Sequence, residues 1–330
     1  MQPVKIAIAG SVATDHLMTY PGRFTDSLVV GSLDTVSLSF LVDDLVVRRG
    51  GCAANICFGL GSVGIEPLLV AAVGSDWSDY EAWLERHRVN TKAVRVSTEL
   101  HTARFLCTTD QDLNQIASFY SGAMREARDI EIGAVAEQFG GLDLVLIGPD
   151  DPDAMLRHTD ACRSLGIPFA ADPSQQLARM DGDQIRLLID GAAYFFTNEY
   201  ERALTSQKTG WSDDEVLSRV GVRITTHGAR GATIERNGHA PVLVGVPKEK
   251  AKVDPTGVGD AFRSGFLAGL AWGLSDERCG QLGAMLATYV IETQGTQEYR
   301  INRDDFLERF EITYGKLAAD EISEYLRCLY

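Results

Sequence analysis

The sequence predicts an α/β protein in which a largely parallel β-sheet is covered by helices on both faces. Short apolar runs rich in β-branched and aromatic residues recur along the chain, and stretches with a helical pattern lie between them. Continuous apolar runs are typical of strands buried on both faces, and their alternation with helices is typical of a parallel sheet. A chain of 330 residues, of which 45% are hydrophobic and 23% charged, can bury a core of this kind.

The expected elements follow in chain order. Strands of the main sheet are expected at residues 4–9, 68–73, 144–147, 168–171, 194–196 and 222–225. The helices between them include residues 53–60, 153–165 and 215–220, and the C-terminal third adds helices at 256–273, 276–294, 304–314 and 316–326. Because no repeat or low-complexity linker divides the chain, we expect a single domain over residues 1–330.

Two regions lack the alternation with helices. Between residues 28 and 48 the chain shows strand patterns at 37–42 and 45–48, and a second strand-rich region runs from 103 to 120. We expect these regions, about 28–49 and 103–120, to form a small antiparallel sheet, the lid, inserted in the main domain. Since a small sheet must bury its apolar face, the lid closes over a ligand, pairs with a second subunit, or does both. A plain surface hairpin is the alternative.

The overall charge excludes two classes of partner. The chain carries 46 acidic and 31 basic residues, which gives a net charge of −15. Such a surface repels phosphate-rich partners, so we expect neither nucleic acid nor an anionic membrane as a partner. A site for a phosphate ligand would have to be positive locally. No run of about 18 apolar residues occurs, and residues 1–6 lead directly into a strand pattern, so we expect a soluble, cytoplasmic protein.

Two further patterns carry no catalytic chemistry. The six cysteines are scattered without a CxxC pair, and we expect them to be small buried side chains in a reducing compartment. Residues 59–64 (GLGSVG) match GxGxxG, but a predicted helix precedes them and a predicted strand follows. Dinucleotide-binding folds have the opposite order, so we expect these glycines to end a helix.

Residues 254–262 (DPTGVGDAF) predict an anion site at the start of a helix. Pro255 and Thr256 suit a turn, and the small residues from Ala261 onwards suit a tightly packed helix. Unpaired amides at a helix start attract anions, and glycines let an anion approach the main chain closely. Asp260, kept a weak base by the helix dipole, could take a proton from an attacking hydroxyl group while the amides stabilise a transferring phosphoryl group. An ordinary N-cap aspartate is the alternative.

Two other positions fit a ligand site. Residues 49–55 (RGGCAAN) place twin glycines before a helix and Asn55 one turn into it, although a helix-entry turn explains them about as well. Asp15 is expected at the carboxyl end of the first strand, where open α/β sheets place ligands. A plain turn aspartate is the alternative there.

Together these segments resemble the ribokinase (PfkB) family of sugar and nucleoside kinases. Residues 49–55 resemble its N-terminal glycine signature, and residues 254–262 resemble its C-terminal signature, with Pro255 where many members carry Thr. Residues 198–201 (NEYE) resemble the family's NxxE element, and residues 226–231 (THGARG) resemble its nucleotide-side TxGxxG turn. All four occur in the expected order. The resemblance covers about residues 5–295 and implies a ribokinase-like fold with a small β-sheet lid.

Within this family the chain resembles the bacterial ribokinase-like adenosine kinases. The matching stretches are residues 10–17, 37–44, 102–105, 115–120 and 172–179. The resemblance implies transfer of a phosphoryl group from ATP to the 5′-hydroxyl of adenosine, giving AMP and ADP, with Asp260 as the base. For the nucleoside, the resemblance implies ribose binding by Asp15, Gly51 and Asn55 with Ser11 nearby, stacking of the purine by Phe105 and Phe119, and a purine pocket completed by Ser39, Gln175 and Gln176. For the transferred phosphoryl group, it implies an anion hole formed by the amides of Gly257, Val258 and Gly259. For the nucleotide, it implies ATP binding by Asn198, Thr226, Gly228 and Gly231, and Mg²⁺ organised through water by Asn198 and Glu201.

Several alternatives stay open on the sequence alone. The acceptor could be ribose, fructose or another nucleoside, although two stacking rings suit a flat purine better than a sugar. Phe105 and Phe119 could instead belong to the lid core, and Gln175 and Gln176 to a polar loop. A nucleoside- or sugar-binding protein without catalysis is the alternative from another class, and Asp260 argues against it. We expect ATP and Mg²⁺, leave a monovalent cation such as K⁺ open, and expect a homodimer through the lid strands.

Overall fold

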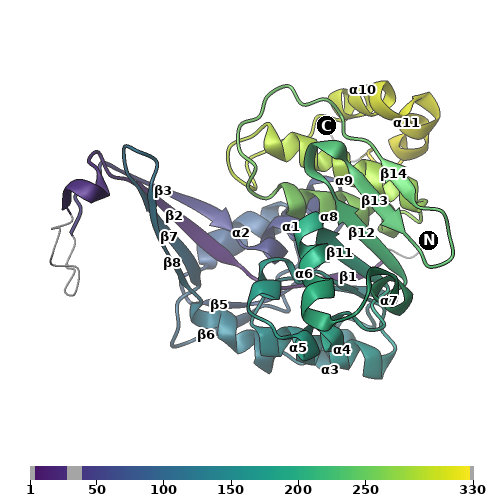
Figure 1. The fold of residues 1–330 in the computed structure, drawn as a ribbon, viewed down its shortest axis with the longest axis horizontal. Helices are drawn as coiled ribbons and strands as arrows, with labels where there is room; N and C mark the ends of the chain where they lie inside the picture. Colours follow the sequence, from purple (N-terminus) through teal and green to yellow (C-terminus); the bar gives the residue numbers. More distant parts are fainter. Residues whose placement is uncertain (1–3, 28–38, 328–330) are drawn as a thin grey trace.

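The centre of the structure, a computed structural model that describes residues 4–27 and 39–327, is an eight-stranded sheet (Figure 1). Its strand order is β14-β13-β12-β11-β10-β9-β1-β4. In chain order these strands are β1 (Ile6–Ala9), β4 (Leu68–Val70), β9 (Leu144–Ile147), β10 (Phe169–Ala171), β11 (Tyr194–Asn198), β12 (Val222–Thr226), β13 (Ala232–Glu235) and β14 (Val242–Val244). Neighbours from β12 to β4 pair in parallel, and β13 and β14 complete the sheet as antiparallel strands. The expected α/β class is confirmed.

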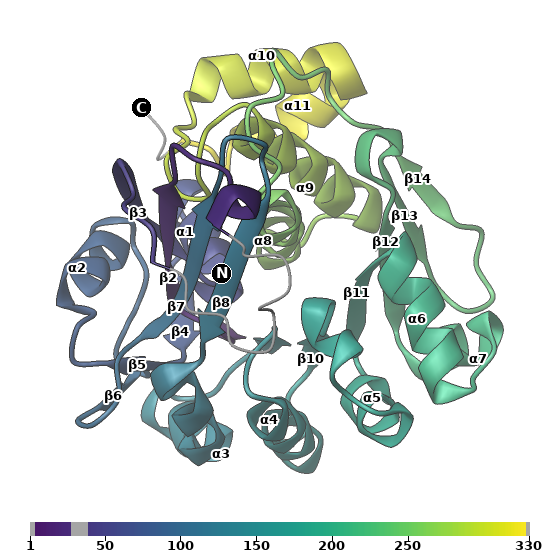
Figure 2. The ribbon, with the colours of Figure 1, turned by 60° about the vertical axis from the view of Figure 1, so that its left-hand side comes forward.

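Helices cover both faces of this sheet because successive residues of a strand point to opposite sides. In β9, Leu144 and Leu146 pack into one apolar core, and Val145 and Ile147 pack into a second. The first core is closed by α1 (Cys52–Ser62), α2 (Ser78–Arg86), α8 (Val258–Ala271), α9 (Asp276–Ile291), α10 (Arg303–Tyr314) and α11 (Lys316–Ser323). The second is closed by α3 (Ile132–Gln138), α4 (Pro152–Leu165), α5 (Gly182–Ile189), α6 (Glu199–Thr209) and α7 (Asp213–Arg219). Figure 2 shows these two helical layers on either side of the sheet.

A second sheet stands off the main body and forms the lid (Figure 1). Its order is β3-β2-β7-β8, with strands β3 (Asp44–Gly50), β2 (Ala13–Thr19), β7 (Ala103–Thr109) and β8 (Gln115–Tyr120). The strands expected at 45–48 and 103–120 are confirmed. Strand β2 had not been expected in the lid, yet it lies at its centre, antiparallel to β3 and parallel to β7. The strand expected at 37–42 is wrong for residues 39–42, which form no strand, and residues 28–38 lie outside the described residues.

The run expected as one strand at 68–73 divides between two sheets. Strand β4 belongs to the main sheet, whereas β5 (Ala72–Gly74) pairs with β6 (Arg95–Ser97) in a sheet of their own. The apolar pattern continues across the break because both strands are buried.

The GxGxxG match proves to be mainly a packing feature. Only Gly64 follows the end of α1 with a positive φ, of 91°. Gly59 and Gly61 lie inside α1, so the expectation that they end the helix is wrong. A Cβ on Gly59 would meet the Ser264 side chain at 2.3 Å, and one on Gly61 would overlap the carbonyl oxygen of His87. These two glycines therefore permit close packing of α1.

Two expectations from composition can be compared with the structure. Among residues 4–27 and 39–327, no helix combines the length and the apolar character needed to cross a membrane. Cys57, Cys107, Cys162 and Cys279 are buried free thiols, as expected, and Cys52 is half-buried.

Candidate active site

Helix α8 begins at the stretch for which the sequence predicts an anion site. Gly257 precedes the helix with a φ of 77°, and a Cβ there would meet the Cγ2 of Thr296 at 2.8 Å. Only glycine fits this position without strain. Within the described part of the chain, the amides of Gly257 and Gly259 have no hydrogen-bond acceptor, and the Val258 amide reaches the Pro255 carbonyl at 3.4 Å. The helix start therefore presents main-chain N–H groups, as an anion site requires.

Two cavities lie against this helix start. One has a volume of about 500 Å³ and the other a volume of about 400 Å³. Residues of the same turn line both: Thr256, Gly257 and Asp260 line the first, and Pro255, Val258 and Gly259 line the second. The start of α8 is thus part of the wall of both cavities.

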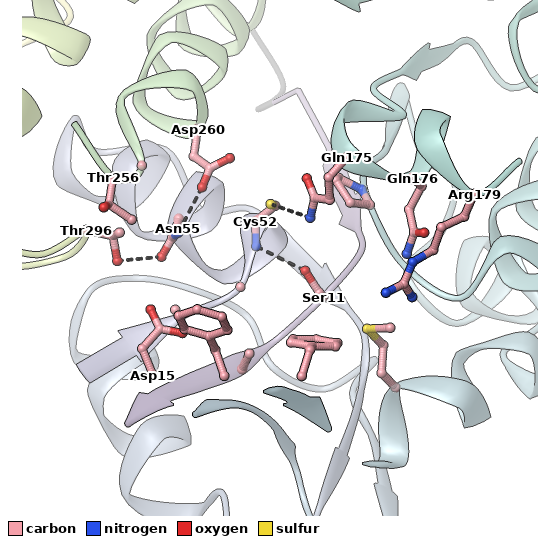
Figure 3. Close-up of a pocket in the computed structure, with 18 residues that line it drawn as sticks. Ser11, Asp15, Cys52, Asn55, Gln175, Gln176, Arg179, Thr256, Asp260 and Thr296 are labelled. Atoms are coloured by element: carbon pink, nitrogen blue, oxygen red, sulfur yellow. Dashed lines mark hydrogen bonds between the residues drawn. The ribbon is translucent and has the colours of Figure 1, made fainter. Parts of the chain in front are cut away.

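The first cavity contains most of the residues predicted for the acceptor (Figure 3). They come from the β1–β2 connection, from the lid, from the start of α1, from the segment after β10 and from the start of α8. The predicted residues that line it are Ser11, Asp15, Gly51, Asn55, Phe105, Phe119, Gln175, Gln176, Gly257 and Asp260. Ser39 is exposed and is not among the lining residues. Cys52, Met124, Arg179 and Thr296 also line the cavity and had not been predicted.

Asp15 reaches the cavity from a different element than expected. It lies in the lid strand β2 and not at the carboxyl end of a main-sheet strand, so that expectation is wrong. Its register partners are Arg48 on β3 and Phe105 on β7. A Cβ on Gly50 would meet the Asp15 Oδ2 at 2.8 Å, so glycine leaves room for the carboxylate. Burial raises the pKa of Asp15, and the charge of Arg48 opposes the rise.

Helix α1 begins in close contact with the connection between β1 and β2. Gly51 has a φ of 93°, and a Cβ there would meet the carbonyl oxygen of Ser11 at 2.6 Å. The Ser11 carbonyl oxygen accepts a hydrogen bond from the Ala53 N–H at 3.1 Å, and the Ser11 Oγ accepts one from the Cys52 N–H at 3.1 Å. The second glycine of the twin pair is therefore needed so that α1 can start beside the cavity.

The second cavity contains the residues predicted for the nucleotide side. Thr226, Gly228 and Gly231 line it together with Lys252 and apolar side chains of α8 and α9. Asn198 is not among the lining residues, but it ends β11 as the register partner of Thr226. Glu249 lines the same cavity and pairs with Lys252 at 3.3 Å, so the two side chains place one charge of each sign there.

Asn198 and Glu201 form the capping box of α6. The Asn198 Oδ1 accepts the Glu201 N–H, and the Glu201 Oε2 accepts the Asn198 N–H, both at 2.8 Å. Glu201 is buried, and this burial raises its pKa. The described residues contain no group of three or more His, Cys, Asp or Glu side chains that could hold a metal ion. The pair offers amide and carboxylate oxygens, which are ligands that Mg²⁺ accepts directly or through its own water shell.

Asp260 is a half-buried carboxylate at the edge of the first cavity (Figure 3). Burial raises its pKa to about 6, against the opposing effects of a hydrogen bond from Asn55 and the charge of Arg263. The expectation of a weak base is therefore wrong, because desolvation outweighs the hydrogen bonds and the arginine charge that lower the pKa. Such a carboxylate is mostly ionised at neutral pH and holds a proton more firmly than an exposed aspartate does.

Asn55 is held between Asp260 and the segment after α9. Its Nδ2 donates to the Asp260 Oδ2 at 2.8 Å. Its Oδ1 accepts from the Thr296 Oγ1 and from the Gln297 Nε2, both at 2.9 Å. Sequence reasoning missed Thr296 and Gln297, because no motif marks them and Thr296 is 241 residues away from Asn55 along the chain.

Arg263 and Asp172 form a buried ion pair behind Asp260. The Arg263 Nη2 donates to the Asp172 Oδ1 at 2.5 Å, and the Arg263 Nε is paired with Oδ2. Asp172 directly follows β10, so the pair ties α8 to the middle of the sheet. The carboxylate raises the pKa of Arg263 and keeps it charged in spite of burial. Neither residue had been given a role, since an ion pair between distant segments leaves no local pattern.

The chain is similar to known kinases over most of its length. The profile of the pfkB family of carbohydrate kinases matches residues 9–302. A nucleoside kinase of Methanocaldococcus jannaschii is 30% identical over 264 residues, which cover 79% of this chain and 85% of that protein. The structure of the Burkholderia thailandensis nucleoside kinase in complex with inosine is 34% identical with a TM-score of 0.82, covering 94% of this chain and 99% of that one. The chain therefore belongs to the pfkB family of carbohydrate kinases and is a phosphotransferase that acts on a hydroxyl acceptor.

Proposed function

We propose that this kinase transfers the γ-phosphoryl group of ATP to the 5′-hydroxyl group of a nucleoside, with adenosine as the favoured acceptor. The observation that carries the proposal is the position of the α8 start between two cavities, one of which has two phenylalanines in its wall. The similarity to proteins named as nucleoside kinases supports a nucleoside as the acceptor.

In this proposal the acceptor lies in the first cavity and ATP in the second, so that they meet at the α8 start. Asp260 accepts the proton of the attacking hydroxyl group, and its raised pKa makes it a better proton acceptor near neutral pH. The amides of Gly257, Val258 and Gly259 stabilise the negative charge on the transferring group. Closure of the lid excludes water and so suppresses hydrolysis of ATP.

On the ATP side, we assign nucleotide binding to Thr226, Gly228 and Gly231 in the second cavity, with Asn198 beside Thr226. Mg²⁺ bound to the phosphates of ATP would neutralise charge during transfer. Asn198 and Glu201 fit a hydrated ion of this kind, because their capping box leaves the Asn198 Nδ2 and the Glu201 Oε1 outside the bonds described.

On the acceptor side, the wall of the first cavity suits a base joined to a ribose. Phe105 and Phe119 are register partners on one face of the lid, where aromatic rings can stack on a purine. The Gln176 Nε2 donates to the Asp150 carbonyl at 2.6 Å, whereas its buried Oε1 has no hydrogen-bond partner among the described residues. A buried acceptor without a partner favours a ligand that donates, such as the exocyclic amino group of adenine. We assign the ribose hydroxyls to Asp15 and Asn55.

A comparison of acceptors tests the proposal. In a coupled assay of ADP release, adenosine should give a higher kcat/KM than inosine, ribose or fructose. Phe119→Ala should raise the KM for adenosine at least about fivefold because it removes one stacking ring. Phe119→Tyr keeps the ring and should stay close to the wild type. Faster turnover of ribose than of adenosine would reject the proposed acceptor, and an equal KM effect on ribose would show that the ring has only a structural role.

We also propose a homodimer formed through the outer face of the lid, which is defined by Leu45, Val47, Leu106 and Ile116. These side chains alternate with those that face the cavity, and they lie on three of the four lid strands. Their exposed fractions are 55%, 54%, 36% and 45%. Exposed apolar side chains that gather on one face of a sheet are typical of a surface that a partner covers.

Charged substitutions on this face should dissociate the dimer. The double variant Val47→Asp/Leu106→Asp is expected to be a monomer by light scattering at micromolar concentration, whereas the wild type is expected to be a dimer. Leu243→Asp is a matched control, because Leu243 is 74% exposed on β14, outside the lid. A monomeric wild type at the same concentration would contradict the proposal.

A further inference from the structure

A chain of hydrogen bonds leads from helix α2 to Asp260. The Trp83 Nε1 donates to the Gln297 Oε1 at 3.1 Å, and the Gln297 Nε2 donates to the Asn55 Oδ1 at 2.9 Å. The Asn55 Nδ2 then donates to the Asp260 Oδ2 at 2.8 Å. Gln297 is 1% exposed and Asn55 is 7% exposed, so water cannot readily replace these partners. Two buried amide groups thus connect an indole to the carboxylate.

The two ends of this chain determine how both amides are oriented. An indole N–H group can only donate, and an ionised carboxylate can only accept. Because Trp83 donates, Gln297 turns its oxygen to the indole and its NH₂ group to Asn55. Asn55 consequently turns its oxygen to Gln297 and its NH₂ group to Asp260.

The neighbouring hydroxyl groups agree with this orientation but do not enforce it alone. Tyr80 donates its one hydroxyl hydrogen to the Gly50 carbonyl at 2.9 Å, so its oxygen accepts from the Gln297 Nε2 at 2.6 Å. Thr296 also has one hydroxyl hydrogen, and two acceptors lie within reach of it: the Asn55 Oδ1 and a main-chain carbonyl. The amide of Gln297 is therefore the donor on which the orientation of Asn55 depends.

We propose that Trp83 and Gln297 are positioning residues for Asp260, which act through Asn55 so that an NH₂ group and not an oxygen faces the carboxylate. The importance of this effect for turnover rests on the proposed role of Asp260 as the base. With the Asn55 amide reversed, two oxygens would face each other at hydrogen-bond distance. That contact would disfavour the ionised carboxylate and displace it from its position.

The other groups that affect the ionisation of Asp260 lie on different elements. Arg263 of α8 lowers its pKa, and Asp172 after β10 raises it. Cys52 of α1 is also close, and burial raises the pKa of its thiol. Tyr299 carries a buried hydroxyl nearby, whose pKa is also raised by burial. A substitution at Trp83 leaves all four in place, so a change in Asp260 can be assigned to the amide chain.

The test is Trp83→Phe, which removes the indole N–H and keeps an aromatic ring against Phe58. The ionisation of Asp260 is followed by carboxyl ¹³C NMR, with the resonance assigned by Asp260→Asn. We expect the titration and the acidic limb of kcat to move together to higher pH. The kcat at pH 6 should fall up to about tenfold, with little change at pH 8. Gln297→Glu should produce a larger shift, because the new carboxylate accepts from Asn55 and so reverses its amide.

Two controls separate this positioning role from a structural one. Trp272→Phe changes a tryptophan at the far end of α8 and should leave the Asp260 titration unchanged. In an Asn55→Ala background, Trp83→Phe should have no further effect, since the chain is already interrupted. An unchanged titration in Trp83→Phe, or an equal shift with and without Asn55, would overturn the proposal. The NMR titration does not depend on turnover, so it tests the positioning role separately from catalysis. If Asp260→Asn remained active while the titration shifted as expected, the proposed role of Asp260 as the base would be refuted and the positioning role would stand.

Discussion

Asp260→Asn is expected to lower kcat by about 10²–10⁴-fold, the range for loss of a general base. Asparagine has nearly the same size as aspartate, and its Oδ1 can still accept the Asn55 Nδ2 that now donates to the carboxylate at 2.8 Å. It cannot accept the proton of the hydroxyl group. Steady-state ADP release with adenosine and ATP measures the loss, and the KM for adenosine should change far less than kcat. Turnover equal to that of the wild type would remove Asp260 from the mechanism.

The same variant should be more stable than the wild type at neutral pH, which distinguishes lost chemistry from misfolding. Because burial raises the pKa of Asp260 to about 6, the folded protein holds this proton more tightly than the unfolded chain does. The contribution of Asp260 to the free energy of unfolding of the wild type should therefore fall as the pH rises from about 4 to 6, and asparagine escapes this loss. In thermal unfolding, the variant should have a higher Tm than the wild type at pH 8 and the same Tm below pH 4. A variant less stable than the wild type at pH 8 would contradict this account.

Asp172→Ala is expected to reduce the free energy of unfolding by about 3–5 kcal/mol, since it leaves a buried guanidinium without its partner. Asp172 is 1% exposed and Arg263 is 7% exposed. The loss should appear as a lower urea midpoint with an unchanged m-value. Activity should fall as well, because the pair holds α8 against the sheet one turn beyond Asp260.

Two further variants test whether the loss of stability arises because the ion pair is buried. The double variant Asp172→Leu/Arg263→Met removes both charges and should recover part of the lost stability. Glu324→Ala breaks an exposed ion pair with Arg327 and should leave the urea midpoint nearly unchanged. A cost for Asp172→Ala no larger than that for Glu324→Ala would show that the buried pair does not stabilise the fold.

Local sequence patterns predicted a helix or strand well where the residues of that element alone determine its pattern. Strand β9 occupies the expected residues 144–147, because a strand buried on both faces is a continuous apolar run. Helix α8 begins where the glycines at 257 and 259 indicated, because a positive φ and open amides need glycine locally. These features depend on neighbouring residues alone.

Sheet membership was harder to predict, because a strand has the same pattern in either sheet. Strand β2 was not expected in the lid, and Asp15 was therefore assigned to the wrong element even though it lines the predicted cavity. Residues 68–73 form an unbroken apolar run, and only pairing partners distant in sequence divide them between two sheets.

The sequence by itself determined the α/β class, the family and most of the segments that line the two cavities, since short motifs with fixed spacing encode them. Only the tertiary structure decided what surrounds Asp260: the amide of Asn55, the two residues after α9 within hydrogen-bond distance of that amide, and the buried pair of Arg263 with Asp172. It also decided that the carboxylate is a stronger base than the helix start alone implies. The physical reason is that desolvation and hydrogen bonds depend on groups brought together from distant parts of the chain, and local sequence does not record that proximity.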